Sequence, residues 1–165
     1  AAPAVLEPET GVDFPPELAK QALVATGARR KLGLRVYAVG LYLDRRSGLW
    51  GRSPGPRELV RGALGRARLR LVITSGLVTQ EKLVATLRKT LGPRLKLGAA
   101  KAEAVLDAFG AVLAKGPALA RGIVLVFEVG RRGVRVQMGR GYRGEVASAP
   151  LATALLSAYL DEKAV

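Results

Sequence analysis

The residues that most enzymes use for chemistry are scarce in this chain. Its 165 residues contain neither histidine nor cysteine, which excludes a Ser-His-Asp triad, an imidazole base, a thiol nucleophile and a zinc site built on these ligands. The 13 acidic residues are scattered, and no pair has the spacing of a metal clamp or of an acid/base dyad. Cations are abundant instead: 27 lysines and arginines give a formal net charge of +14.

One arginine stands where a cation is costly to keep. Arg29 precedes the segment Leu34–Leu43, which is apolar on both faces of a predicted strand apart from Arg35. A cation held in an apolar setting needs an anion, and the guanidinium fork suits carboxylate or enolate oxygens. Tyr37 and Tyr42 could add hydroxyl donors. We expect an anion site around Arg29, with a structural or surface arginine as the alternative.

The remaining positive charge is spread over the whole chain. The densest clusters are 29–31, the alternating Arg66, Arg68 and Arg70, and Arg131 with Arg132. A nucleic-acid binder would need a reading element or interleaved aromatic residues, and no such pattern is present. We interpret the charge as a basic solvated surface and expect no nucleic-acid partner. The alternative is binding to nucleic acid or to an anionic membrane, driven by the net charge of +14.

A glycine-rich segment, Gly139–Gly144, has the pattern G-x-G-x-x-G between a predicted strand and a predicted helix. A dinucleotide site would need a second strand after that helix, and only a few residues follow it in this sequence. We therefore expect a glycine-rich loop and no cofactor.

The hydrophobic pattern predicts the elements that must position these residues. Residues 1–18 are expected to be extended or irregular, 22–26 form a short apolar run, and 44–57 have the composition of turns and loops. The predicted strands cover 34–43, 66–74, 123–129 and 134–138, and the predicted helices cover 79–91, 101–115 and 148–160. This order favours one α+β domain over residues 1–165, with helices on one side of a mainly antiparallel sheet. No stretch is apolar enough to predict a membrane span.

At these residues the chain resembles the chalcone-isomerase-like family. The most specific match is Gly27–Lys31 leading into Val36–Asp44, and supporting matches are Glu7–Phe14, Ser75–Thr79 and Ala152–Asp161. The resemblance covers nearly the whole chain in order. It implies an open-faced β-sandwich, in which a large antiparallel sheet is covered by a helical layer.

The resemblance implies one of two activities. Chalcone isomerases close a chalcone to a (2S)-flavanone by intramolecular attack of a phenolate on an enone, and an arginine stabilises the developing charge without a cofactor. The other branch comprises non-catalytic fatty-acid-binding proteins, in which the equivalent arginine and a tyrosine hold the carboxylate inside an apolar cleft.

The family's site residues carry over position by position. The arginine corresponds to Arg29, and Tyr37 stands where isomerases usually have threonine, as in the fatty-acid binders. Thr79 and Thr86 replace the isomerase tyrosine and asparagine, and Ala158 replaces its late threonine. The resemblance therefore implies a non-catalytic binder of fatty acids or similar apolar carboxylates. A weak or latent chalcone isomerase with Arg29 as its catalytic residue is the alternative.

Further expectations follow from the same resemblance. Arg30 could take the place of Arg29, because the segment between the arginine and Tyr37 is shorter than in plant members. A small-molecule ligand, no metal or organic cofactor, a monomer, and a soluble location in cytoplasm or plastid stroma are expected. The composition, rich in Ala, Leu, Gly and Arg, fits a reconstructed ancestor of the two branches or a GC-rich genome.

Overall fold

The computed structural model describes residues 4–31, 34–44, 65 and 67–160. Within these ranges the chain forms short and long β-strands, three α-helices and one 3-10 helix. In chain order they are β1 (Val5–Leu6), β2 (Asp13–Phe14), β3 (Glu17–Leu18), β4 (Gln21–Lys31), β5 (Leu34–Leu43), β6 (Ala67–Ile73), α2 (Gln80–Leu91), η2 (Gly92–Arg94), α3 (Ala99–Ala114), β7 (Val124–Val129), β8 (Val134–Met138), β9 (Tyr142–Val146) and α4 (Ala149–Leu160).

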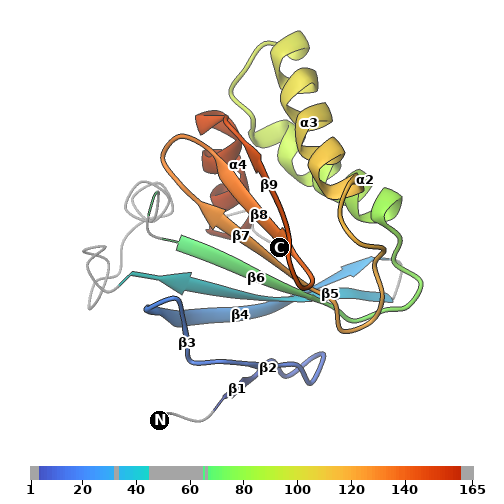
Figure 1. Ribbon diagram of the computed structural model, residues 1–165, viewed down its shortest axis with the longest axis vertical. Helices are drawn as coiled ribbons and strands as arrows, with labels where there is room; N and C mark the ends of the chain where they lie inside the picture. The colour runs from blue at the N-terminus through green and yellow to red at the C-terminus, as the bar shows by residue number, and fades with distance from the viewer. Residues whose placement is uncertain (1–3, 32–33, 45–64, 66, 161–165) are drawn as a thin grey trace.

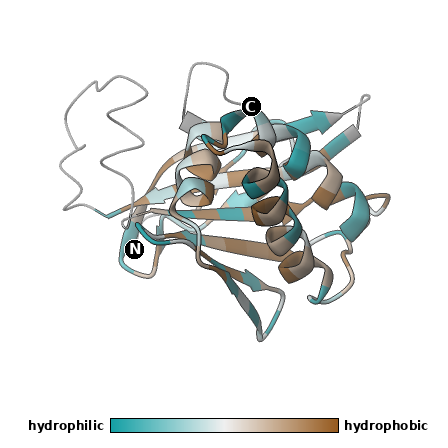
Figure 2. Cartoon of the chain, turned by 90° about the horizontal axis from the view of Figure 1, so that it is seen from above, coloured by the Kyte–Doolittle hydropathy of each residue, from teal (hydrophilic) through white to brown (hydrophobic). Residues whose placement is uncertain are grey.

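The strands β3 to β9 form one seven-stranded sheet in sequence order, and each neighbouring pair is antiparallel. All three α-helices lie on one face of this sheet (Figures 1 and 2). We call that face the core face and the opposite one the outer face. The predicted α+β fold, an open-faced β-sandwich with a helical layer, is confirmed.

Strand β5 is buried on both faces, as its sequence predicted. Its core-face residues, including Val39 and Leu41, belong to the main apolar cluster with the helices. On the outer face, Ala38 belongs to a second cluster with Phe14 and Val72. The N-terminal segment thus covers β5 from outside, which explains why this strand lacks alternating polar residues.

Local sequence signals set the helix ends. The Thr79 hydroxyl accepts a hydrogen bond from the amide of Lys82, and Gly92 follows the last residue of α2. The Ser148 hydroxyl accepts from the amide of Leu151 at the start of α4. Within the described residues, no helix combines the length and the apolar character needed to cross a bilayer.

Two predicted regions differ from the structure, and most of a third lies outside the described residues. The apolar run 22–26 and the basic residues after it form one continuous strand, β4. The N-terminal segment contains three short strands. The predicted loop 44–57 lies outside the described residues beyond Asp44, and so does Arg66 of the alternating arginines.

The glycine-rich segment is a turn followed by a strand, so the prediction of a loop throughout was wrong. Gly139 and Gly141 have φ of 58° and 109°, a region that favours glycine and permits the tight β8–β9 turn. Strand β9 then pairs with β8. The Tyr142 hydroxyl donates to the carbonyl of Val112 in α3, 2.6 Å away, which fixes β9 against the helical layer.

Candidate functional site

The β4–β5 pair places Arg29 directly opposite Tyr37. Residues that face each other in an antiparallel pair project to the same side of the sheet. Tyr37 belongs to the main apolar cluster and is 2% exposed, so this side is the core face. Ile73 of β6 continues the same row. The sheet therefore holds the Arg29 side chain on the face that the helices cover.

A register shift separates Arg29 from Arg30. Such irregularities re-aim neighbouring side chains. The Arg30 side chain is 52% exposed, and its Nε lies 3.3 Å from a carboxylate oxygen of Glu9. Arg30 thus has a surface carboxylate partner, which favours Arg29 as the arginine of the site.

Helix α4 adds a second phenol that the sequence did not single out. The hydroxyl oxygens of Tyr37 and Tyr159 lie 2.6 Å apart and share a hydrogen bond. Tyr159 is packed against the main apolar cluster. Its one sequence signal was the apolar stripe of the last helix, which is equally typical of a residue that only packs in a core.

Burial controls the protonation of both phenols. It raises the pKa of Tyr37, and the hydrogen bond with Tyr159 and the charge of Arg29 lower that pKa in part. Burial also raises the pKa of Tyr159 well above its ordinary value, and the proximity of Tyr37 raises it further, against the charge of Arg29. Both side chains are neutral at physiological pH, so the cluster carries the positive charge of Arg29.

The guanidinium of Arg29 is incompletely paired. Its Nε is buried, and no hydrogen-bond partner for it exists among the described residues. A buried donor on a cation is expensive to leave unpaired. The cluster therefore combines a fixed positive charge with two neutral O–H groups, an arrangement that attracts an oxyanion.

Arg70 is a matched case on the outer face. One of its Nη atoms is also buried without a partner among the described residues. Its guanidinium carbon lies 5.5 Å from the ring centroid of Phe14, however, which is a cation–π contact. The N-terminal segment that covers the outer face thus gives the Arg70 cation a favourable contact with an aromatic ring.

Tyr42 does not join the Arg29 cluster, so our suggestion that it adds a donor there was wrong. It lies five residues after Tyr37 on the same strand, and this odd spacing projects it to the outer face. Its hydroxyl donates to the carbonyl of Pro15 at 2.8 Å. Burial raises the pKa of Tyr42 to about 12 against the opposing charge of Arg70.

The other predicted site residues lie on the helices. Thr79 is exposed and its hydroxyl caps α2. Thr86 lies on the buried side of α2 at 4% exposure, and its carbonyl accepts from the Thr90 hydroxyl at 2.9 Å. Ala158 is fully buried next to Tyr159 in α4, and α2 contacts α4. Tyr37 and Tyr159 are joined by a direct hydrogen bond. The ligand-binding roles of Thr79 and Thr86 stay predictions.

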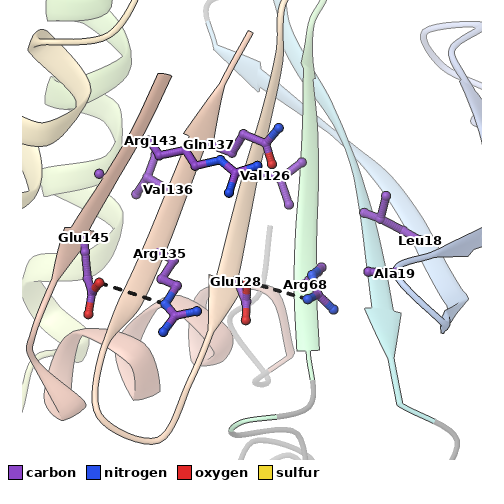
Figure 3. A pocket seen from close by; sticks show the side chains of 11 residues that line it. Leu18, Ala19, Arg68, Val126, Glu128, Arg135, Val136, Gln137, Arg143 and Glu145 are labelled. Carbon is purple, nitrogen blue, oxygen red and sulfur yellow. Dashed lines mark ion pairs between the residues drawn. The ribbon is translucent and has the colours of Figure 1, made fainter. Parts of the chain in front are cut away.

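A hollow of about 590 Å³ lies on the outer face. Arg68, Glu128, Arg135 and Glu145 cross it in register on β6 to β9 (Figure 3). Arg68 lies 3.6 Å from Glu128, and Arg135 lies 3.9 Å from Glu145. These cations already face carboxylates, so this hollow is a weaker carboxylate site than the Arg29 cluster. No metal-binding group of His, Cys, Asp or Glu occurs among the described residues.

The fold defines a known class of protein. It matches the crystal structure of the fatty-acid binding protein AtFAP1 of Arabidopsis thaliana with a TM-score of 0.78. The match covers 98% of this chain and 90% of that one, at 22% sequence identity. A family model described as chalcone isomerase-like matches residues 11–165. The chain belongs to the chalcone isomerase-like family, as the resemblance predicted. A search of curated proteins gave no match.

Proposed function

We infer that this protein binds a small apolar carboxylate, such as a fatty acid, with Arg29 as the charged partner of the ligand. One observation carries the proposal: the Nε of Arg29 is buried without a partner among the described residues, beside two neutral phenols. A carboxylate would supply the missing acceptors and neutralise the charge. Bidentate pairing of arginine with a carboxylate is among the strongest polar contacts in proteins.

The two phenols suit the same ligand. Because Tyr37 and Tyr159 share one hydrogen bond, one hydroxyl donates to the other and the second proton is free. A carboxylate placed beside this bond can accept that proton, or accept from both hydroxyls if it takes the place of the bond. Thr86 on the buried side of α2 and Thr79 at its start complete the set of ligand-binding residues that we propose.

The surroundings of Arg29 suit an apolar chain. Gly27 precedes Arg29 by two residues on β4 and so faces the same side. A Cβ built on Gly27 would meet only Val39 Cγ1 within 4 Å, at an ordinary distance of 3.8 Å. Ile73, which continues the row, is fully buried in the main apolar cluster. The structural similarity to AtFAP1, itself described as a fatty-acid binding protein, supports the same ligand class.

Isothermal titration calorimetry with lauric, palmitic and stearic acid tests this proposal. We expect saturable binding by the unaltered protein and a loss of at least roughly tenfold in affinity in Arg29→Met, which keeps an apolar stem and removes the charge. Arg30→Met removes the neighbouring surface charge and should bind normally. No binding by the unaltered protein, or equal binding by Arg29→Met, would refute the proposal.

Chalcone isomerase activity is the second candidate, because a cation beside two phenols also suits an enolate oxygen. The chain departs from the isomerase pattern at Tyr37, Thr79, Thr86 and Ala158, so we expect little or no turnover. The assay follows the loss of chalcone absorbance and the enantiomeric excess of the flavanone. A rate above buffer that disappears in Arg29→Met would establish an isomerase, and a rate equal to buffer would exclude it.

A further inference from the structure

One end of the molecule combines exposed apolar loops with cations. Three segments meet there, and we call them together the loop end: residues 75–82, residues 115–122 and the β8–β9 turn 139–141. The Gly122 amide donates to the Ile73 carbonyl at 2.8 Å, and the Gln80 side-chain amide donates to the Gly116 carbonyl at 2.9 Å. A Cβ on Gly139 would lie 3.3 Å from the Pro117 ring, so the turn abuts the second segment. Figure 1 shows the connections before α2 and before β7 at the same end.

The loop end presents apolar side chains to solvent. Leu77 is 63% exposed, the highest value among the large apolar side chains of the described residues. Pro117, Ala118 and Ala120 on the adjoining segment are also exposed, while Leu119 between them packs on the main apolar cluster. Exposed apolar residues that gather at one end of a molecule often mark a surface that contacts a partner or a membrane.

Cations flank these apolar residues. The three segments contain Lys82, Lys115, Arg121 and Arg140, all exposed, against one acidic residue, Glu81. The Lys82 ammonium donates to the carbonyl of Leu77 at 3.3 Å, which places it directly beside the exposed leucine. Apolar groups that can enter the acyl region, next to cations that meet anionic headgroups, are the features of interfacial membrane binding.

We propose that the loop end docks onto the surface of a bilayer containing anionic phospholipids. Leu77 enters the headgroup–acyl boundary, and the four cations contact the phosphate groups around it. The opposite end of the sheet also carries cations, at Lys20, Arg131 and Arg132, but the exposed large apolar residue that follows Lys20 in the chain, Val24, is only 40% exposed and lies within β4. The combination, rather than charge alone, distinguishes the loop end.

This surface adjoins the candidate site. Arg29, Tyr37 and Ile73 form the last row that includes β6, two residue pairs from the end of the β4–β5 ladder, and Gly122 of the loop end bonds directly to Ile73. An apolar ligand leaving a bilayer at Leu77 would therefore reach the row of Arg29 over a short path. The docking proposal rests on the surface itself and does not require that the bound ligand be a fatty acid.

Vesicle co-sedimentation tests the proposal with two pairs of matched variants. Vesicles of phosphatidylcholine alone are compared with vesicles that also contain phosphatidylglycerol. In the apolar pair, Leu77→Ser is the test and Val24→Ser is the control. Val24 lies on β4 and is 40% exposed. The charge pair replaces three cations by glutamine at either end: Lys115, Arg121 and Arg140 at the loop end, and Lys20, Arg131 and Arg132 at the other.

We expect binding to the anionic vesicles, a loss of about tenfold in the partition coefficient for Leu77→Ser, and a larger loss for the loop-end triple variant. Val24→Ser and the opposite-end triple variant should bind nearly as the unaltered protein. Equal losses from the two triple variants would overturn the proposal in favour of general adsorption of a basic protein. Tighter, salt-dependent binding to duplex DNA that the loop-end variants weaken equally would assign the surface to nucleic acid instead. Fatty-acid calorimetry on the same variants reports on the Arg29 site separately.

Discussion

The hydroxyl oxygens of Tyr37 and Tyr159 lie 2.6 Å apart, although 122 positions separate the two residues in the chain. One comes from the buried strand β5 and the other from the last helix, so the bond joins the sheet to its helical layer. Arg29 lies opposite Tyr37 and acts on the pKa of both phenols. The contact is therefore both a structural link and the polar centre of the proposed binding site.

The two tyrosines should be energetically coupled. Either Tyr37→Phe or Tyr159→Phe leaves the other hydroxyl buried without this partner, so each should lower the free energy of unfolding by about 1 to 2 kcal/mol. The double variant removes both polar groups and should cost less than the sum of the single changes. Urea unfolding of the four proteins gives the coupling energy. Additive effects would show that the bond contributes nothing to stability.

Removing the charge of Arg29 should cost binding but not stability. Arg29 lacks a partner for its buried Nε among the described residues, so Arg29→Met should leave the free energy of unfolding unchanged or raise it. Arg88 is the control, because it forms ion pairs with Glu103 and Asp107 between α2 and α3. Arg88→Met should lower stability by about 0.5 to 1 kcal/mol. Thermal unfolding measures both, and a marked loss in Arg29→Met would assign Arg29 a structural role.

Alkaline pH should destabilise the protein through the same phenols. The folded state holds the protons of Tyr37 and Tyr159 more tightly than the unfolded chain, where a tyrosine has a pKa near 10. Folded molecules therefore bind more protons above this pH, and the free energy of unfolding falls as pH rises. The contribution is fully present below pH 10 and is lost as the pH rises towards the folded-state pKa.

Urea unfolding as a function of pH measures this effect. The slope should become shallower in the double variant Tyr37→Phe/Tyr159→Phe than in the unaltered protein. Tyr42→Phe is the control on the outer face: it should remove only the contribution between pH 10 and about 12, where the pKa of Tyr42 lies. An unchanged slope in the double variant would contradict the burial of these hydroxyls.

The parts of the fold that the sequence predicted correctly depend on local chemistry. The pattern of 34–43, apolar on both faces apart from Arg35, predicted a strand buried on both faces, and Thr79 predicted the start of α2 through its capping hydroxyl. The prediction for the glycine-rich segment was wrong because glycines obscure the alternating pattern by which a strand is recognised. Strand β9 depends on pairing with β8 and on the close packing of Gly144 under Val112, where a Cβ would come within 2.5 Å of Val112 Cγ1.

The sequence predicted two of the three polar residues that meet at the candidate site. Arg29 stands out as a cation just before an apolar strand, and Tyr37 as a phenol within that strand. The two residues face each other because β4 and β5 are consecutive antiparallel strands. Tyr159 could not be found in this way, because its contact depends on how the last helix packs across the sheet. Its position on an apolar helix stripe is the same for a residue that only fills the core.

Gly40, which lies in the matched segment Val36–Asp44, should be required because the N-terminal segment packs directly over it. A Cβ on Gly40 would lie 2.7 Å from Cδ1 of Phe14, closer than real Cβ atoms approach, and 3.1 Å from Cδ1 of Leu23, which is a tight contact. Gly40→Ala must therefore displace the buried Phe14 ring and should destabilise the protein by about 1 to 3 kcal/mol. Gly27→Ala on the neighbouring strand is the control, since its Cβ would meet only Val39, at 3.8 Å. It should change stability by less than about 1 kcal/mol. Adding Phe14→Leu to Gly40→Ala relieves the overlap and should recover part of the loss in chemical unfolding; equal stability of the two alanine variants would contradict this account of the motif.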